Sequence, residues 1–384
     1  MDGQSLSIEE ISAVALPQTL DGSEGSNRAR GVVRQTAADT DVKAIRLWLA
    51  EYVNSPHTLR SYRKEAVRLL FWATQAIGKP LSSLNREDLL AYEAFLANPS
   101  AEWIDTSMPR RGSKRRLLDG PLSPRSIAQA MGILSGLFGY LVEAGYLAGN
   151  PLTLRRRRGE SRKSRHAAAE RYLDHALWHS VLAFIDTLPA QSRREQQHYE
   201  RVRWLFRFLY GASLRVSEAA QAKSSDLSQR RGKWWLHVVG KGGAEGDVPI
   251  SDELMRDLAR YRQFHSMPAV PTALEGGPLV MSVTGRTDQF LTPTAVYLIV
   301  KEVFRRAAAS LESTDPAGAQ TLRRASTHWL RHTSAAHQAD AGNDMRFIQK
   351  NLRHASIETT SIYLHAEDDL RHVQTTGEYS DAKQ

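Results

Sequence analysis

Apolar residues recur at helical spacing through most of the first 150 positions of the chain. Residues 1–37 are the exception, because they are rich in Gly, Ser, Gln and Thr without a clear period, and they predict a flexible arm. Beyond the arm, the pattern predicts helices that begin near Asp41 and run from about Pro56 to Ile77, from Arg86 to Leu96 and from Pro124 to Glu143. Asn85 and Ser123 are the expected N-caps of the last two. Residues 38–152 are therefore expected to form a compact domain of four or five helices.

The rest of the chain is also mainly helical, with one strong β signal. Lys233–Val239 is aromatic and β-branched, a glycine-rich turn follows, and Asp247–Ile250 returns as a short second strand. Residues 153–170 follow the Asn150-Pro151 turn and are rich in arginine, so we interpret them as a linker. The predicted fold class is mainly α. A helical N-terminal domain is joined to a mostly helical α+β domain, residues 171–384, which carries a small β-sheet and a polar C-terminal tail.

The composition is typical of a globular protein with two domains. A chain of 384 residues with 41% hydrophobic side chains is too long for one ordinary core. The absence of cysteine excludes disulfides and thiolate zinc sites. The N-terminus lacks the basic and apolar regions of a signal peptide, and no stretch approaches about 18 uncharged apolar residues. We therefore expect a cytoplasmic protein without a membrane span.

Positive charge is concentrated in clusters, which favours a polyanionic partner. The net charge is +9 and the pI is about 9.7, although basic proteins also arise without such a partner. Two clusters stand out: Arg155–Arg158 with Arg162, Lys163 and Arg165, and Arg110, Arg111, Lys114, Arg115 and Arg116. Charge runs are usually solvated segments. Their positions in a loop and between the domains shift the balance toward phosphate contact.

The predicted second helix carries another group of cations away from its apolar positions: Arg60, Arg63, Lys64 and Arg68. One interpretation is an ordinary solvated helix face. The other is a helix face that lies against DNA. The sequence leaves both open.

Arg215 is the first candidate for chemistry on a phosphate. It follows the largely apolar stretch Leu209–Leu214, which is expected to hold it on a buried, rigid segment. Arginine binds phosphate through a planar, permanently charged fork. An arginine in this setting is usually a snorkelling or ion-paired residue. Glu218, three residues later, is the expected ion-pair partner or a group that orients Arg215.

His328 and Arg331 form a second candidate pair. They stand three residues apart, so on a helix that begins near Thr327 both project from one face. One side chain can then hold a phosphate while the other transfers a proton, although an isolated His-x-x-Arg is usually a charged surface. A zinc site built from His328, His332 and His337 is disfavoured, because no Glu follows His328 and His337 is out of phase.

Tyr363 is the candidate nucleophile, and it lies nine residues after His354. A phenol with a pKa near 10 is a poor nucleophile at neutral pH unless cations or a base assist it. Most tyrosines in a chain with 12 of them are packing residues. The argument for this one comes from the arginines and histidines that precede it in order.

These fragments together resemble the tyrosine recombinase (phage integrase) family over about residues 38–370. Five motifs carry the resemblance in order: Leu209–Glu218, Val239–Gly243, His328-Trp-Leu-Arg331, Asn351–Thr360 and Ile362-Tyr363-Leu-His365. Each motif alone is unspecific, whereas five in this order are specific.

The resemblance implies a role for each of six residues. Tyr363 would attack the scissile phosphate and leave a 3′-phosphotyrosyl link. Arg215 and Arg331 would clamp the non-bridging oxygens. His328 would act in proton transfer and phosphate contact, and His354 would hydrogen-bond the phosphate. Lys241 would protonate the departing 5′-oxygen.

The resemblance also implies the fold and the partners. It expects an N-terminal helical (SAM-like) core-binding domain and a tyrosine recombinase catalytic domain that form a C-shaped clamp around double-stranded DNA recombination sites. Four protomers would act in the synaptic complex, with accessory DNA-bending proteins as a further class of partner. No cofactor, metal or membrane is expected, and the protein would serve a mobile element or a chromosome system.

The sequence departs from the family pattern at two places. Family members commonly have glycine just before the histidine that corresponds to His354, and here Arg353 stands there. If that glycine serves a tight backbone conformation, arginine alters the local geometry, or it adds a phosphate contact. Lys241 lies in a turn rich in glycine, which predicts a lysine that is mobile before DNA binds.

Two alternative functions remain open on the sequence alone. A type IB topoisomerase uses similar chemistry as a monomer, but the N-terminal helical domain favours a recombinase. A DNA-binding protein with a decayed catalytic site is the other alternative. The complete set of Arg215, His328, Arg331, His354 and Tyr363 argues against decay.

Overall fold

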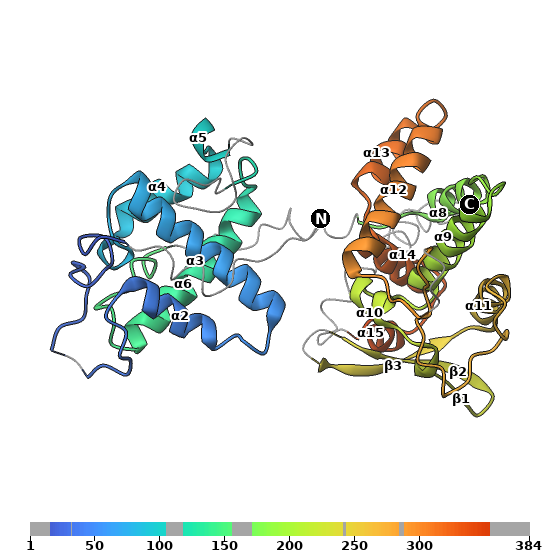
Figure 1. Cartoon of the computed structure of the whole chain (residues 1–384). Helices are drawn as coiled ribbons and strands as arrows, with labels where there is room; N and C mark the ends of the chain where they lie inside the picture. The colour runs from blue at the N-terminus through green and yellow to red at the C-terminus, as the bar shows by residue number, and fades with distance from the viewer. Residues whose placement is uncertain are drawn as a thin grey trace, which may run out of the picture. The chain divides into compact units, whose positions relative to one another are not determined.

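The computed structural model describes residues 16–31, 33–104, 118–155, 171–240, 243–283 and 288–353. The chain divides into two compact units, Met1–Arg158 and Gly159–Gln384, each with its own hydrophobic core (Figure 1).

The regular elements described in the N-terminal unit are helices, with one isolated β-bridge between Arg28 and Leu147. Its elements are α2 (Asp41–Ala50), α3 (Pro56–Ala76), the short 3-10 helix η1 (Leu81–Ser83), α4 (Arg86–Ala97), α5 (Ala101–Ile104) and α6 (Pro124–Glu143). The predicted caps operate: the Asn85 side chain accepts from the Asp88 amide at the start of α4, and the Ser123 side chain accepts from the Ser126 amide at the start of α6. The apolar faces of these helices meet in one core around Trp48, Trp72 and Phe138.

The prediction of a flexible arm is wrong for the part of residues 16–37 that packs on this unit. Arg28 is buried, donates to the carbonyl oxygens of Gly22 and Asp39 at 2.9 Å, and lies over the Tyr146 ring. The Asn27 side chain donates to the Gly149 carbonyl at 2.8 Å. The contacts with Gly149 and Tyr146 are long-range contacts of single residues, so hydrophobic periodicity gives no sign of them.

The cations of α3 also differ from both interpretations of the sequence. Arg60 and Lys64 are exposed, but Arg63 and Arg68 are buried. Arg68 pairs with the buried carboxylate of Glu65 at 2.8 Å. Two of the four cations, Arg63 and Arg68, therefore belong to the interior of the unit. The four do not form one solvated or DNA-facing helix surface.

Among the described helices, α6 is the one with the length, and the mean hydropathy of 1.2, that a membrane crossing requires. Its buried residues, among them Met131, Leu134 and Phe138, contribute to the N-terminal core. A central core helix passes the same test of length and composition, because it needs an apolar surface for its neighbours.

Asp41 makes the stability of the folded N-terminal unit depend on pH. Its carboxylate is fully buried; it accepts hydrogen bonds from the Ser82 amide at 3.1 Å and the Tyr146 hydroxyl at 2.9 Å. Burial raises the pKa of Asp41 to about 6 despite these hydrogen bonds. The folded state therefore favours the protonated form. The stabilisation that Asp41 provides is complete below the pKa that Asp41 has in the unfolded chain, near 4. It is lost as the pH rises through the folded-state pKa of about 6.

We expect Asp41→Asn to flatten this pH dependence. In the wild type the free energy of unfolding of the N-terminal unit should fall by about 3 kcal/mol between pH 4 and pH 7 because of Asp41. Urea unfolding, followed through hydrogen exchange in α2 and α6, measures it. Asp39→Asn removes an exposed carboxylate nearby and is the matched control. An equal pH slope in wild type and Asp41→Asn would contradict the assignment.

The second unit is mainly helical. Its helices are α8 (His175–Asp186), α9 (Arg193–Gly211), α10 (Val216–Gln221), α11 (Asp252–Phe264), α12 (Pro293–Leu311), α13 (Pro316–Arg324), α14 (Thr327–Asp340) and α15 (Met345–Leu352), with a 3-10 turn η2 (Ser224–Asp226). Trp204, Phe206 and Phe208 of α9 and Phe304 of α12 are fully buried at the centre of the core. This packing holds α9, α10 and α14 in fixed relation to one another.

A three-stranded antiparallel sheet completes this unit, in the order β1 (Leu227–Arg230), β2 (Lys233–Val239) and β3 (Glu245–Ile250). Leu227, Leu236 and Val248 are aligned across the three strands and face the core. The sequence predicted β2 and the later part of β3 but missed β1. That strand has four residues and only one buried side chain, so it carries no alternation to detect.

Candidate active site

Arg215 caps the N-terminus of α10, directly after the buried turn that ends α9. Ser213 in this turn has a positive φ of 50° and is buried, and Leu214 is fully buried, so the backbone leading to Arg215 is tightly held. The Arg215 side chain is 31% exposed and donates from Nη1 to Glu218 Oε1 at 2.8 Å. The ion pair expected from the sequence is thus confirmed, with the guanidinium still partly open to solvent.

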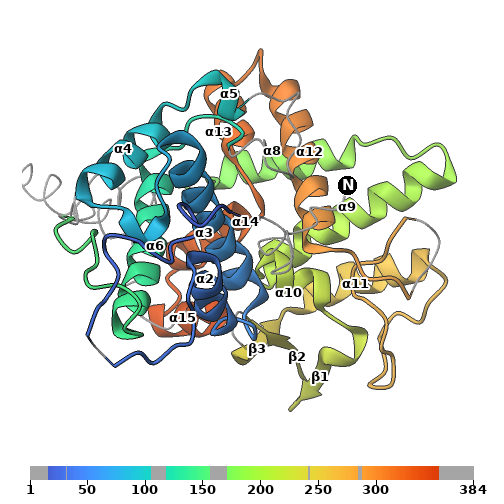
Figure 2. The same cartoon turned by 60° about the vertical axis from the view of Figure 1, so that its left-hand side comes forward.

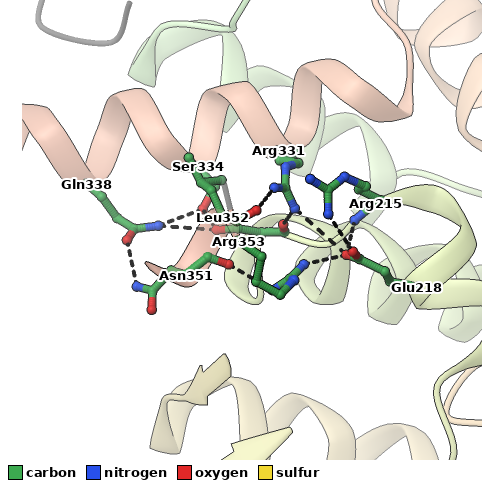
Figure 3. A network of polar contacts seen from close by, with 9 residues as sticks. Arg215, Glu218, Arg331, Ser334, Gln338, Asn351, Leu352 and Arg353 are labelled. Carbon is green, nitrogen blue, oxygen red and sulfur yellow. Dashed lines mark hydrogen bonds and ion pairs between the residues drawn. The ribbon is translucent and has the colours of Figure 1, made fainter. Parts of the chain in front are cut away.

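Arg331 and His328 lie on the first turns of α14, which begins at Thr327 as predicted. The Arg331 side chain is 1% exposed; its Nη1 donates to the Ser213 carbonyl at 2.7 Å and its Nη2 donates to the Leu352 carbonyl. Its Nη1 also lies 3.8 Å from Glu218 Oε2. Arg331 therefore connects the turn before Arg215 with the end of α15 (Figure 3).

His328 is exposed at the surface, but much of its ring lies against neighbouring atoms, and the charges of Arg331 and Arg215 act on it. Desolvation of its ring, and next the positive charges of Arg331, Arg215 and Arg171, lower its pKa below the usual value. A neutral imidazole at neutral pH can accept a proton, and an anionic phosphate placed among the same cations would favour its protonation.

Glu218 is the common partner of the arginines, and its side chain is 0% exposed. Its Oε2 accepts from the Arg215 amide at 2.7 Å and its Oε1 accepts from the Arg215 guanidinium. Burial acts to raise the pKa of Glu218. The charge of Arg353, the hydrogen bonds from Arg215 and the charge of Arg331 outweigh that effect and hold the pKa below its usual value. Glu218 is therefore an anion that fixes the cations around it.

Arg353 is the third guanidinium on this carboxylate, and its role was not evident from the sequence. Its Nη2 donates to Glu218 Oε2, and its Nη1 donates to the Asn351 carbonyl at 2.8 Å. Its φ is 51° and its ψ is 46°, the left-handed conformation, at the C-cap of α15. The hypothesis that this position needs a tight backbone conformation is therefore correct, and Arg353 adopts that conformation.

A polar network behind Arg331 was also missed in the sequence. Ser213 and Ser334 share a hydrogen bond of 2.7 Å between their hydroxyls, and the Gln338 side chain donates to both (Figure 3). Asn351 Nδ2 in turn donates to Gln338 Oε1 at 3.3 Å. The one available signal was a serine, Ser213, inside an otherwise apolar stretch.

The histidines do not form a metal site among the described residues. The rings of His328 and His332 lie edge to face, 4.2 Å apart. His337 is buried elsewhere: its Nε2 lies 3.0 Å from the Leu173 carbonyl and its Nδ1 lies 2.9 Å from the Tyr210 hydroxyl. The prediction that His337 faces away from His328 and His332, because it is out of helical phase with them, is thus correct.

Lys241, His354 and Tyr363 lie outside the described residues, but two of their neighbours contact the cluster. A Cβ placed on Gly240 would lie 3.3 Å from Glu218 Oε1 and 3.7 Å from Arg215 Nη1, so glycine permits the end of β2 to approach the ion pair. Arg353, the residue before His354, is bonded to Glu218. Helix α15 also lies beside β3 (Figures 1 and 2). The residues that directly precede Lys241 and His354 in the chain therefore both lie at the Glu218 cluster.

Comparison with known proteins identifies this arrangement. Residues 171–369, just over half of the chain, match the phage integrase family, and the match spans all six predicted site residues. The tyrosine recombinase XerC of Rhodospirillum centenum is 31% identical over 312 residues, which cover 80% of this chain and 77% of that protein. The chain belongs to the phage integrase family. It is a tyrosine site-specific recombinase, an enzyme that cleaves and rejoins DNA.

Further relatives agree with this assignment. XerC of Azotobacter vinelandii is 30% identical over 324 residues, covering 83% of this chain and 88% of the relative. Among solved structures, the XerH site-specific recombinase bound to a palindromic difH substrate matches with a TM-score of 0.59 at 19% identity, covering 87% of this chain and 85% of that one. A λ integrase dimer bound to a COC′ core site matches with a TM-score of 0.52 at 16% identity, covering 83% and 76%.

At these identities the two structural matches establish the fold: a mainly helical protein whose catalytic unit carries a small antiparallel sheet. Both of those proteins were crystallised on DNA recombination sites. The recombinase relatives also decide against the type IB topoisomerase alternative.

Proposed function

We propose that this recombinase breaks DNA with Tyr363 and holds the broken end as a 3′-phosphotyrosyl link. The observation that carries the proposal is the cluster of Arg215 and Arg331 around Glu218, with His328 on the same helix as Arg331. Two guanidiniums from segments far apart in sequence provide the permanent positive charge that an attacked phosphodiester requires.

Each further residue takes one step of the reaction. The phenol oxygen of Tyr363 forms the new bond to phosphorus as the bond to the 5′-oxygen breaks. Lys241 delivers a proton to that 5′-oxygen, and His354 donates a hydrogen bond to the phosphate. His328 accepts the proton that the Tyr363 phenol loses and returns it when the strand is rejoined, consistent with its lowered pKa. The 5′-hydroxyl of a partner strand then reverses the step, and the energy of the phosphodiester is conserved throughout.

Arg331 requires one rearrangement for this role. Its guanidinium is 1% exposed and donates to the Ser213 and Leu352 carbonyls. To contact a phosphate, the guanidinium would exchange one of these carbonyl acceptors for a phosphate oxygen. The Leu352 carbonyl would be the one exchanged, because it lies at the end of α15, next to the segment that carries His354. Arg215, 31% exposed, would meet the phosphate first.

The domain arrangement follows the same proposal. Residues 38–152 would clamp the duplex together with the catalytic domain, residues 171–384, and the basic residues 153–170 would contact phosphates between them. Residues 1–37 would form an N-terminal extension. Four protomers would act on two double-stranded sites in the cytoplasm, with DNA-bending proteins as accessories.

Covalent trapping on a nicked suicide DNA substrate tests this function. Cleavage beside the nick releases a short fragment, so rejoining fails and the adduct accumulates. We expect a covalent protein–DNA complex attached at the 3′-phosphate, which peptide mapping assigns to Tyr363. A protein that binds the recombination site but never forms an adduct would support the decayed DNA-binding alternative.

A further inference from the structure

Arg353 occupies a backbone conformation that is unfavourable for it. Its φ of 51° lies in the left-handed region, which glycine enters without steric cost and arginine does not. The family resemblance expects glycine at this position. A residue that retains such strain in place of glycine needs a compensating interaction.

The side chain of Arg353 supplies that interaction with three elements at once. Its guanidinium donates to Glu218 of α10 and to the Asn351 carbonyl of α15. Its stem lies on β3, because a Cβ placed on Gly246 would lie 3.0 Å from Arg353 Cδ. The side chain is only 9% exposed. Arg353 therefore joins α10, α15 and the strand that follows the Lys241 turn.

We propose that Arg353 is a positioning residue of this recombinase: it neutralises Glu218 and locks the end of α15, from which the chain continues to His354, against the catalytic arginines before DNA binds. The inference rests on the proposed function of Arg215, Arg331 and His354. Arg353 itself contacts no reacting atom in this scheme and acts through Glu218.

The charge balance explains why such a lock helps catalysis. Three guanidiniums surround one buried carboxylate, so the cluster keeps a surplus of positive charge for an incoming phosphate. Without Arg353, Glu218 would offset a larger part of the charge on Arg215 and Arg331. The end of α15 would also lose its bond to α10. Both changes weaken a site that depends on fixed positive charge.

The test uses Arg353→Gly, which restores the family residue and also removes the backbone strain. We expect single-turnover cleavage of the suicide substrate to slow by about ten- to a hundredfold. DNA affinity should change by less than about threefold, since the side chain is buried and its guanidinium is already bonded to Glu218. Arg353→Gln keeps the strained backbone and loses only the charge, so it should slow cleavage to a similar extent even if the glycine variant folds poorly. Arg353→Lys should retain most of the rate.

The pH profile of cleavage separates positioning from a general structural role. Glu218 is faced by Arg215, Arg331 and Arg353, and the adjoining Gly240 carries no charge. Loss of Arg353 removes a cation that lowers the pKa of Glu218. Cleavage should fall at low pH when Glu218 is protonated, because the carboxylate that fixes Arg215 and Arg331 is then lost. This acid limb of the profile should move to higher pH in Arg353→Gly and Arg353→Gln and stay in place in Arg353→Lys. The lowered pKa of His328 has causes that do not include Arg353, so its titration should not move.

Arg231→Gly is the matched control. Arg231 also has a positive φ, of 53°, in the exposed turn between β1 and β2, so this change removes the same charge and the same strain away from Glu218. Its cleavage rate and acid limb should remain those of the wild type. If wild type forms the Tyr363 adduct while Arg353→Gly and Arg353→Gln cleave at the wild-type rate with an unmoved acid limb, this inference is wrong and the proposed function stands. If wild type forms no adduct, the proposed function itself fails.

Discussion

Replacing Tyr363 with phenylalanine is expected to abolish covalent capture of DNA. The substitution removes one hydroxyl and retains the aromatic ring, so folding and DNA binding should persist while the only atom proposed to attack phosphorus is gone. On the nicked suicide substrate, wild type should accumulate the adduct and Tyr363→Phe should give none above background. Denaturing gel electrophoresis with labelled DNA measures this, and a mobility shift assay under native conditions measures binding.

Tyr297→Phe is the matched control for that experiment. Tyr297 is partly exposed on α12 and belongs to no proposed step, so its loss should leave both adduct and binding unchanged. An adduct that persists in Tyr363→Phe would show that another residue is the nucleophile. Loss of binding together with the adduct would instead indicate a packing role for Tyr363.

The second large effect is expected from Arg215→Ala. Arg215 is the more accessible of the two arginines, and its guanidinium is proposed to stabilise the charge that develops on the phosphate oxygens. Removing one preorganised donor of this kind lowers the cleavage rate by about a thousandfold. Single-turnover cleavage measures the rate. DNA affinity should fall by no more than about tenfold, because one phosphate contact among many is lost.

Two comparisons define the interpretation of Arg215→Ala. Arg215→Lys retains the charge but not the planar fork, so its rate should lie between wild type and alanine. Arg256→Ala removes an exposed arginine of α11 and should cleave as wild type. If cleavage and affinity fall in parallel for Arg215→Ala, then Arg215 positions the DNA and does not stabilise the transition state.

The secondary structure of the N-terminal unit was largely predictable because it depends on local signals. Caps such as Asn85 and Ser123, and apolar positions at helical spacing, gave α4 and α6 with nearly correct ends. The missed elements lack a local signal. Strand β1 is too short to show an alternation, and the stretch around Arg28 is held in part by the Tyr146 ring, which lies far along the chain.

The site shows the same division. The order of motifs was sufficient to name Arg215, His328 and Arg331, and the spacing of three between Arg215 and Glu218 was sufficient to predict their ion pair. The burial of Arg63 and Arg68 was not predictable, because periodicity reports where apolar residues face and does not report which cations are paired inside.

The sequence by itself determined the family, the chemistry of the candidate residues and the position at which glycine is replaced. Whether Arg353 would distort that position, add a phosphate contact or bind an internal partner depended on a carboxylate 135 residues away in the chain. Only the tertiary structure decided that it binds Glu218. The physical reason is that ion pairing in a buried site depends on distance and desolvation in space, and neither is encoded in the local order of residues.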